Sequence, residues 1–363
     1  MTRAAVDAAH MAQALRLAER GLYTTQPNPR VGCVVTHGEQ VVGQGWHERA
    51  GGPHAEVHAL REAGARARDA TAYVTLEPCA HHGRTPPCAD ALVAAGVARV
   101  VIAVNDPFPQ VAGRGIGQLR AAGIAVECGL MQEAARELNI GFFSRIERQR
   151  PWVRVKLAMS LDGRTALANG ESKWITGAAA RMDVQHWRAR SSAILTGIGT
   201  VLADDPWLTV RLDDTPFTPP MRVILDRHLR TPAGSHVLDG QVPTLLLHGA
   251  AAPMADGRFE RVEPIAIAEH DGRLDMQAVL ALLAERGCSE LHVEAGPTLC
   301  GALFAAGLAD ELLLYVAPVM LGDSARPLMH LPPLAEMAAR WRLRTIDQRQ
   351  VGEDWRLRLR PQR

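Results

Sequence analysis

Hydrophobic and polar positions along the first half of the chain predict strands that alternate with helices. Residues 7–20 carry apolar side chains at helical spacing, and Gly21 ends that pattern. Short apolar runs follow that are typical of buried strands, at residues 31–35, 41–46, 72–76, 100–104 and 124–128. Helical patterns separate them, beginning at His54 and Cys88 and covering residues 115–121 and 131–146. A hairpin followed by repeated strand–helix units indicates a sheet with helices on both faces, an α/β/α layer.

The alternation starts again after a polar break. The run ERQRP ends at Pro151, so we place a domain boundary there and predict domains at 1–149 and 150–363. Predicted elements of the second domain are strands at 152–160 and 193–196, a helix at 178–190, and strands at 311–316 and from 341 onward. Both domains therefore belong to the α/β class.

Composition narrows the classes of protein. Apolar residues make up 47% of the chain and charged residues 22%, and the net charge is +1. Such a balance gives no basic field for nucleic acid. Charges interrupt the first residues, and no apolar run is long enough to cross a membrane. The six cysteines have no framework-like spacing. We therefore expect a cytoplasmic protein with neither nucleic-acid nor membrane partners.

One stretch carries candidate metal chemistry. His54, Cys79 and Cys88 offer one imidazole and two thiolates, which leaves one tetrahedral position of a zinc ion open, as in catalytic zinc sites. Glu56 lies two residues beyond the histidine, where it could shuttle protons. Alternatively, the cysteines are buried hydrophobes and the histidine a surface group. The combination favours zinc, because both His54 and Cys88 follow a proline and open a predicted helix.

The first half of this stretch fits the His-x-Glu…Pro-Cys-x-x-Cys pattern of zinc nucleobase deaminases, but eight residues separate the two cysteines here. With that longer gap, TLEPCAHHGRTPPC resembles the deaminase half of the bifunctional riboflavin-biosynthesis deaminase/reductases. KLAMSLDGRTA, GESKWIT, GTVLADDPWLTVR and VEAGPTLCGAL resemble the reductase half of the same family. The resemblance covers nearly the whole chain. It implies a cytidine-deaminase-like domain followed by a dihydrofolate-reductase-like domain, with Zn²⁺ and NADPH as cofactors.

The resemblance also implies roles for individual residues. Substrate contacts in the deaminase half fall on Asn28, His81 and Arg84. NADP contacts in the reductase half fall on Ala158, Trp174, Thr200, Asp204, Arg227, Gly296, Pro297, Thr298, Leu299, Cys300, Gly301 and Ala302. Substrate contacts there fall on Ser172, Arg188, Leu208, Arg211 and Glu294. The family often has a small hydroxylated residue where this chain has Arg227, so the chain departs from the family pattern at that position.

Some of these residues also draw attention without the resemblance. Two prolines bracket Asn28 and make it part of a rigid loop, although a plain turn has the same pattern. Lys156 is a charge within an apolar strand, and such a lysine is usually either paired or functional. Arg227 follows a predicted parallel strand, where a cationic side chain suits the 2′-phosphate of NADP; a solvated surface arginine is equally consistent.

The resulting hypothesis has two steps. Zinc-activated hydroxide replaces the amino group of a diaminopyrimidine ribosylamine phosphate, with Glu56 moving the protons. NADPH then reduces the opened ribosyl group to ribityl, with Lys156 and Glu294 assisting and Arg188 and Arg211 holding the phosphate. The partner is thus a small pyrimidine ribosyl phosphate, and we expect a homo-oligomer, a dimer or a tetramer. Two alternatives remain. One is a deaminase that acts on tRNA or free nucleosides and whose second domain has another purpose; the other is a binding module that zinc stabilises, without catalysis.

Overall fold

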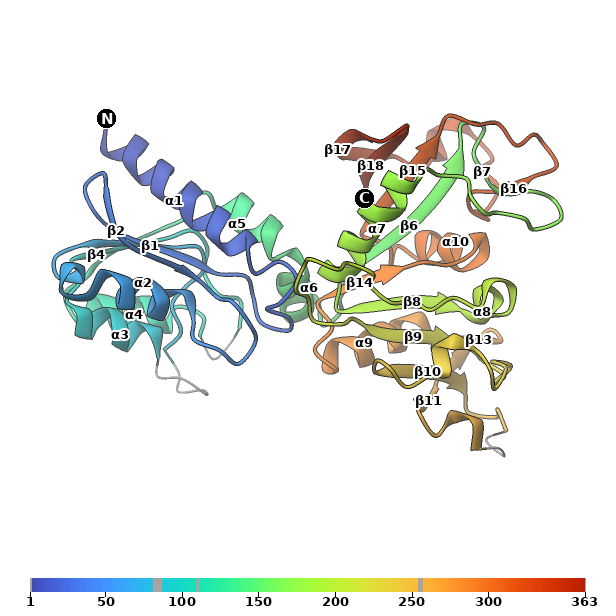
Figure 1. The fold of residues 1–363 in the computed structure, drawn as a ribbon, viewed down its shortest axis with the longest axis horizontal. Coiled ribbons are helices and arrows are strands. Elements are labelled where there is room, and N and C mark those ends of the chain that lie inside the picture. The colour runs from blue at the N-terminus through green and yellow to red at the C-terminus, as the bar shows by residue number, and fades with distance from the viewer. Residues whose placement is uncertain (1, 81–86, 109–110, 254–256, 363) are drawn as a thin grey trace. The chain divides into compact units, whose positions relative to one another are not determined.

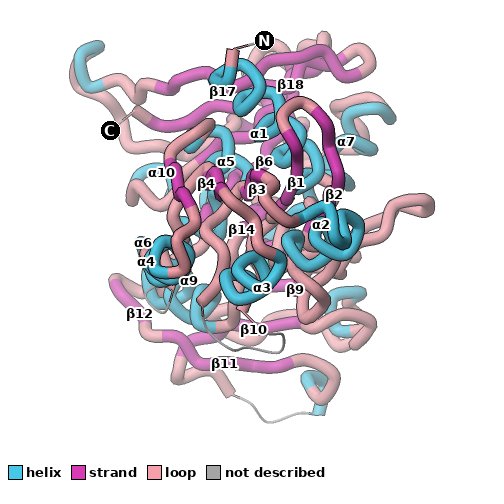
Figure 2. The backbone as a smooth tube through the Cα atoms, turned by 90° about the vertical axis from the view of Figure 1, so that its left-hand side faces the viewer, coloured by secondary structure: helices cyan, strands magenta, loops and turns pink. Residues whose placement is uncertain are grey.

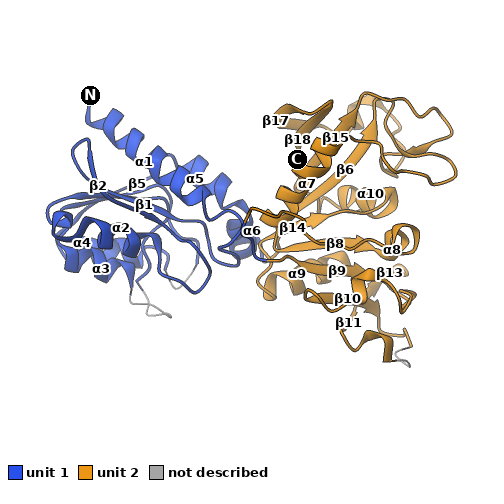
Figure 3. Ribbon diagram, in the orientation of Figure 1, with its two compact units in different colours: residues 1–149, 216–218 blue, residues 150–215, 219–363 orange. Residues whose placement is uncertain are grey.

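The structure is a computed structural model that describes residues 2–80, 87–108, 111–253 and 257–362. The chain divides into two compact units (Figure 3). Unit 1 comprises Met1–Gln149 with Pro216–Thr218, and unit 2 comprises Arg150–Thr215 with Pro219–Arg363. Strands and helices alternate through both units (Figure 2). Within the described residues, no helix has both the length and the apolar character needed to cross a membrane.

Unit 1 is built on a five-stranded sheet in the order β2-β1-β3-β4-β5 (Figure 1). Its strands are β1 (Gly32–His37), β2 (Gln40–Trp46), β3 (Thr71–Val74), β4 (Arg99–Ile102) and β5 (Ala125–Cys128). Its helices are α1 (Arg3–Glu19), α2 (Ala55–Ala63), α3 (Cys88–Ala95), α4 (Arg114–Ala121), α5 (Gln132–Leu138) and α6 (Ile140–Arg148), with the 3-10 turn η1 (Gly64–Ala67). β1 pairs antiparallel with β2 and β3, whereas β3, β4 and β5 are parallel.

Glycines of the first hairpin let helices approach the sheet from both sides. A Cβ atom at Gly32 would lie 2.0 Å from the carbonyl oxygen of Ala14 in α1, and one at Gly43 would lie 2.2 Å from that of Ala59 in α2. Gly32 and Gly43 point to opposite faces, because side chains alternate along a strand. The predicted α/β/α layering is confirmed, and α2 is held firmly against the sheet.

The predicted helix over residues 131–146 is in fact two helices. α5 ends at Leu138 and α6 begins at Ile140. Between them, Asn139 Nδ2 donates to the carbonyl oxygen of Arg30 at 2.9 Å, and Asn139 Oδ1 accepts from the backbone N–H of Arg30 at 2.8 Å. Asparagine competes with a continuous helix when its side chain bonds to other backbone groups, and here it bonds to a distant loop.

Unit 2 is built on a nine-stranded sheet in the order β11-β10-β9-β8-β14-β6-β15-β18-β17. These strands are β6 (Trp152–Ser160), β8 (Ala193–Gly197), β9 (Met221–Leu225), β10 (Thr244–Gly249), β11 (Glu263–Ile267), β14 (Glu290–Val293), β15 (Glu311–Ala317), β17 (Leu343–Val351) and β18 (Asp354–Pro361). All neighbours from β11 to β15 are parallel, and β18 and β17 extend the sheet antiparallel. Small ribbons lie outside it: β7 (Arg164–Ala166) with β16 (Arg326–Pro327), and β12 (Glu269–His270) with β13 (Arg273–Leu274).

Helices cover both faces of the larger sheet. α9 (Met276–Glu285) and α10 (Pro297–Ala305) share a hydrophobic cluster with Val153 and Val155 of β6. The alternate residues of β6, Arg154 and Lys156, point to the other face, where α7 (Ala178–Arg190) packs and Arg154 lies over the ring of Trp187. α8 (Ile198–Asp204) covers a separate cluster on this second face. The 3-10 turns are η2 (His236–Leu238), η3 (Gly257–Phe259) and η4 (Met337–Ala339).

Candidate active sites

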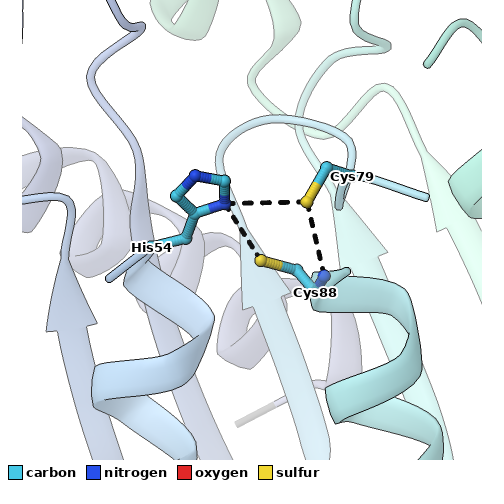
Figure 4. A group of neighbouring side chains, drawn as sticks. All are labelled: His54, Cys79 and Cys88. Carbon is cyan, nitrogen blue, oxygen red and sulfur yellow. Dashed lines mark hydrogen bonds between the residues drawn. The ribbon is translucent and has the colours of Figure 1, made fainter. Parts of the chain in front are cut away.

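The starts of two helices bring the predicted metal ligands of unit 1 together. His54 is the extended N-cap residue of α2, Cys88 is the first residue of α3, and Cys79 lies between them in sequence. His54 Nδ1 lies 3.2 Å from Cys88 Sγ and 3.6 Å from Cys79 Sγ (Figure 4). The three ligand atoms all lie within 4.8 Å of one another. Among the residues that the structure describes, these form the one such group of histidine, cysteine and acidic side chains.

This geometry fits a tetrahedral zinc ion. Ordinary Zn–S and Zn–N bond lengths at tetrahedral angles place a nitrogen about 3.6 Å from a sulfur atom, close to the two separations seen here. The pKa of Cys79 is lowered to about 4, because the Cys88 thiol, the His54 ring and the Cys88 backbone N–H all donate to its sulfur. A lowered pKa favours the thiolate, which is the form that binds metal.

Glu56 lies beside the candidate ligands in the first turn of α2. Only 3% of its surface is exposed. Burial raises the pKa of its carboxyl group, and the negative charge of Cys79 acts in the same direction. A carboxyl group with a raised pKa can take up and release a proton near neutral pH, as a general acid–base catalyst must.

Asn28 is held in a fixed orientation. His47 Nδ1 donates to the carbonyl oxygen of Pro53 at 3.0 Å, so its Nε2 is free to accept a hydrogen bond from Asn28 Nδ2 at 3.2 Å. His47 is 3% exposed, and burial lowers its pKa, which keeps the ring neutral. The structure places His47 in the interior, where its ring meets the His54 ring edge-on. Asn28 keeps its carbonyl oxygen available as an acceptor.

Two predicted substrate contacts, His81 and Arg84, lie outside the described residues. The sequence also missed a residue that shapes this site. Glu77 precedes the Pro78-Cys79 pair, and its buried carboxylate accepts the backbone N–H groups of Asp106, Gly113 and Ile116 at 3.1–3.3 Å. The signal was a carboxylate in an apolar strand end, followed later by the glycine-rich loop NDPFPQVAGRG. Glu77 therefore fixes that loop against the segment that carries Cys79.

Unit 2 brings three predicted residues together on the α7 face of its sheet. Arg188 of α7 forms a two-point ion pair with Glu294, which follows β14, with Nε–Oε1 at 2.5 Å and Nη2–Oε2 at 2.9 Å. Arg188 Nη1 donates to the carbonyl oxygen of Thr209 at 2.8 Å. Half-buried Lys156 lies on the neighbouring strand; burial lowers its pKa, and the Glu294 charge partly offsets that shift.

Electrostatics separate the roles of these groups. The pKa of Glu294 lies well below its ordinary range, despite burial, because of the Arg188 charge, the hydrogen bonds from Arg188 and the nearby His292 ring. The ionised form of Glu294 is therefore favoured, which makes this residue a poor proton donor. Arg188 commits each of its nitrogens to a protein acceptor, whereas Arg211 has an exposed side chain.

Most of the predicted cofactor residues gather at the carboxyl ends of neighbouring parallel strands. α8 follows β8 and carries Thr200 and Asp204; α10 follows β14 and begins at Pro297. A Cβ atom at Gly197, before α8, would lie 3.5 Å from Leu299 Cδ2 of α10, so the two helix starts are close. Cofactors bind at such strand ends in open parallel sheets.

The remaining predicted residues are less uniform. A Cβ atom at Gly301 would lie 2.1 Å from the carbonyl oxygen of His330, so packing against the chain explains that glycine without a ligand. Trp174 is 69% exposed and lies under the guanidinium of Arg181. Arg227 pairs with Glu269 at 2.5 Å. Among the other positions, Ala158 lies in β6, Ser172 is half-buried and Leu208 is buried. Gly296 is the N-cap residue of α10, and Thr298, Cys300 and Ala302 lie within that helix.

Comparisons with known proteins agree with this geometry. Residues 5–104 match the model for the cytidine and deoxycytidylate deaminase zinc-binding region, and residues 151–357 match that for the RibD C-terminal domain. The chain is 50% identical over 361 residues to riboflavin biosynthesis protein RibD of Escherichia coli, covering 96% of this chain and 97% of that protein. It is 45% identical to RibD of Haemophilus influenzae, covering 98% and 97%.

Solved structures give the same result. Acinetobacter baumannii RibD, form 1, matches with a TM-score of 0.93 and 46% identity, covering 99% of this chain and 100% of that one. A Thermotoga maritima diaminohydroxyphosphoribosylaminopyrimidine deaminase/5-amino-6-(5-phosphoribosylamino)uracil reductase matches with a TM-score of 0.87 and 31% identity, with the same coverage. The predicted fold class, a deaminase domain followed by a reductase domain, is confirmed.

Proposed function

The chain belongs to the RibD family of riboflavin-biosynthesis enzymes, and from this premise we propose how its residues divide the two reactions. It is a bifunctional enzyme that deaminates 2,5-diamino-6-(ribosylamino)pyrimidinone 5′-phosphate and then reduces the ribosyl group to ribityl. Its cofactors are Zn²⁺ and NADPH. The convergence of His54, Cys79 and Cys88 beside buried Glu56 is the observation that carries the assignment of the first reaction to unit 1.

In the deaminase site we assign the metal to His54, Cys79 and Cys88. A bound zinc ion would supply the Lewis acidity that activates water toward the amino-bearing ring carbon. Glu56 would accept the proton of that water and pass it to a ring nitrogen. It would then take the proton of the added hydroxyl group and give it to the amino group, which leaves as ammonia while the ring carbonyl forms. Asn28, fixed by His47, would accept a hydrogen bond from the pyrimidine and so orient the ring.

In the reductase site we assign proton transfer to Lys156. Opening of the ribosylamine breaks the bond from the anomeric carbon to the ring oxygen, and that oxygen takes up a proton. An ammonium group whose pKa is lowered by burial gives up a proton more readily than an ordinary lysine. A bound NADPH would supply the hydride that reduces the anomeric carbon. Glu294, fixed by Arg188, would hold the ammonium in place, and exposed Arg211 would bind the substrate phosphate.

These roles refine the hypothesis drawn from the sequence. There, Glu294 shared in proton delivery and Arg188 shared in phosphate binding. A carboxylate with a strongly lowered pKa suits a positioning role better, and so does an arginine whose nitrogens all donate to protein acceptors. We also propose two properties of the whole chain: that it works in the cytoplasm and that it forms a homo-oligomer. The edge position of β17 in its sheet supports the second.

One experiment tests the assignment. The purified chain is incubated with the diaminopyrimidine ribosyl phosphate while ammonia and NADPH are followed separately, and its zinc content is measured. We expect ammonia to appear first and NADPH to be consumed in equal amount afterwards. Substrate that is already deaminated should consume NADPH without ammonia. A chain that holds no zinc, or that consumes NADPH before any ammonia appears, would contradict the proposal.

A further inference from the structure

In unit 2, one turn joins Asp204, which is assigned to NADPH, to Leu208 and Arg211, which are assigned to the substrate, and its backbone is unusual. It runs from the end of α8 to Arg211, and two of its non-glycine residues have left-handed conformations: Asp205 with φ +41° and Leu208 with φ +48°. Leu208 is also 2% exposed. A bulky residue in this region carries strain and stays there only when its surroundings hold it. Contacts with the surrounding residues must therefore stabilise the left-handed conformations of Asp205 and Leu208.

His236 is the residue that contacts the start of this turn. Its Nδ1 lies 2.9 Å from the carbonyl oxygen of Asp205 and 2.8 Å from Asp205 Oδ2, so Nδ1 must carry the proton between two acceptors. The backbone N–H of His236 also donates to Asp205 Oδ1 at 2.9 Å. Its ring stacks on Trp207, with centroids 3.9 Å apart and planes 30° apart. A single histidine thus contacts two residues of the strained turn.

His236 is itself firmly anchored. It begins the 3-10 turn η2, whose Val237 and Leu238 lie in the same buried cluster as Leu208. Fully buried Arg222 of β9 donates to the carbonyl oxygens of His236 and Val237 at 3.4 and 3.5 Å. The histidine therefore connects the turn to the rigid sheet.

The far end of the turn is held by α7. Arg188 Nη1 donates to the carbonyl oxygen of Thr209, and Gln185 Oε1 accepts the backbone N–H of Arg211 at 3.0 Å. These contacts fix residues 209–211 next to the Glu294 site. At the Asp205 end, the backbone N–H of Asp205 donates to the carbonyl oxygen of Val201 in α8, and η2 supplies the contacts to the Asp205 carbonyl oxygen and carboxylate. The two ends of the turn therefore depend on different elements.

We propose that His236 is a positioning residue of the reductase: by holding the strained turn it sets Asp204, assigned to NADPH, relative to Leu208, assigned to the substrate. The inference rests on the proposed function, because both assignments belong to it. If the turn relaxes, only a fraction of molecules can bind either ligand. The affinity of each ligand measured alone then falls by the same factor, since one equilibrium governs both sites.

Two variants of nearly identical size test this role in the full chain. In His236→Asn a side-chain amide can still donate to Asp205, whereas in His236→Asp a carboxylate faces the Asp205 carboxylate and repels it. The dissociation constants of NADPH alone and of the deaminated pyrimidine alone are measured by titration. His236→Asp should weaken both by about tenfold and by the same factor, and His236→Asn should stay within about threefold of the wild type.

Controls separate this role from general damage. His270→Ala removes an exposed histidine of β12 and should leave both affinities unchanged. Ammonia release by unit 1 should be the same in every variant. Equal affinities in His236→Asp and His236→Asn, or a loss confined to one ligand, would overturn the proposal. Asp204→Ala and Arg211→Ala test the premise separately: if neither weakens its assigned ligand, the contact assignments fail whatever the His236 variants do.

Discussion

Arg188 and Glu294 form a two-point ion pair in the second unit, with nitrogen–oxygen distances of 2.5 and 2.9 Å. The pair joins helix α7 to the end of strand β14, two elements far apart in the sequence. It keeps Glu294 ionised beside Lys156, so that a fixed negative charge lies next to a lysine whose ammonium form burial disfavours. The reductase site therefore depends on a carboxylate that does not itself exchange protons.

The Glu294→Gln variant should impair reduction and leave deamination unchanged. The amide cannot neutralise Arg188, and removal of one partner of a buried pair leaves the other uncompensated. We expect NADPH consumption with deaminated substrate to fall about a hundredfold, by analogy with the loss of preorganised charge at other active sites. Ammonia release should not change. Arg188→Lys keeps the charge without the two-point geometry and should give an intermediate loss. A Glu294→Gln rate within twofold of the wild type would remove Glu294 from the site.

Glu56→Gln tests the proton carrier of the deaminase. The amide occupies the same volume in the first turn of α2 but cannot accept the proton of the attacking water. Ammonia release should fall by about 10²–10⁴-fold, the usual contribution of a positioned general base. Zinc content, measured by atomic absorption, should stay at the wild-type level. Retained ammonia release would show that another group moves the protons.

Much of the deaminase site could be predicted from the sequence, because its candidate ligands lie in recognisable local sequence contexts. His54, Cys79 and Cys88 each stand next to a proline or at a helix start, and that context predicted their convergence. The division of the predicted helix at Asn139 could not be predicted from the sequence. The Asn139 side chain bonds to the backbone of Arg30, which lies over a hundred positions away. The role of Glu77 depends likewise on backbone groups of a distant loop.

In the reductase site, the sequence identified the individual residues but not the contacts between them. The sequence identified Arg188 and Glu294 as separate candidates, and only the three-dimensional packing pairs them. No periodicity or motif indicates that the carboxylate of one residue will hold the guanidinium of another on a different element. A prediction of charge state therefore needed the structure, even where the residues themselves were already named.

Metal removal should divide the two activities. Cys88→Ser replaces a soft thiolate ligand with a hydroxyl group, which zinc binds poorly. We expect zinc content to fall below the wild-type level and ammonia release to be lost, while NADPH consumption with deaminated substrate persists. A chelator applied to the wild type should reproduce this pattern. The control Cys128→Ser changes an exposed cysteine outside the cluster and should leave zinc content unchanged. Equal loss of both activities on chelation would contradict a metal role confined to the deaminase.

Asn28 and His47 should act as one unit. Without the His47 ring, the Asn28 amide loses the acceptor that fixes its orientation. His47→Ala and Asn28→Ala should each raise the KM for the diaminopyrimidine about tenfold, the cost of one or two lost hydrogen bonds. The double variant should be little worse than either single one, because both changes remove the same interaction. Fully additive losses would show that His47 acts independently of Asn28.

Lys156 should give reduction a characteristic pH dependence. Burial disfavours its ammonium form and lowers its pKa, so the proton that we assign to ring opening is lost at a lower pH than an ordinary lysine would lose it. The rate of NADPH consumption with deaminated substrate should therefore be constant on the acidic side and fall as the pH rises through that lowered pKa. Ammonia release provides the internal control, since it uses different groups.

Lys156→Arg decides whether that decline belongs to the lysine. A guanidinium stays protonated throughout the alkaline range, so the decline should disappear. The rate should also fall about a hundredfold, because a guanidinium is a poor proton donor and general acid catalysis contributes roughly that much. Lys156→Met, which removes the charge, should be at least as slow at every pH. If Lys156→Arg keeps the same alkaline decline as the wild type, the titrating group lies elsewhere and Lys156 does not deliver the proton.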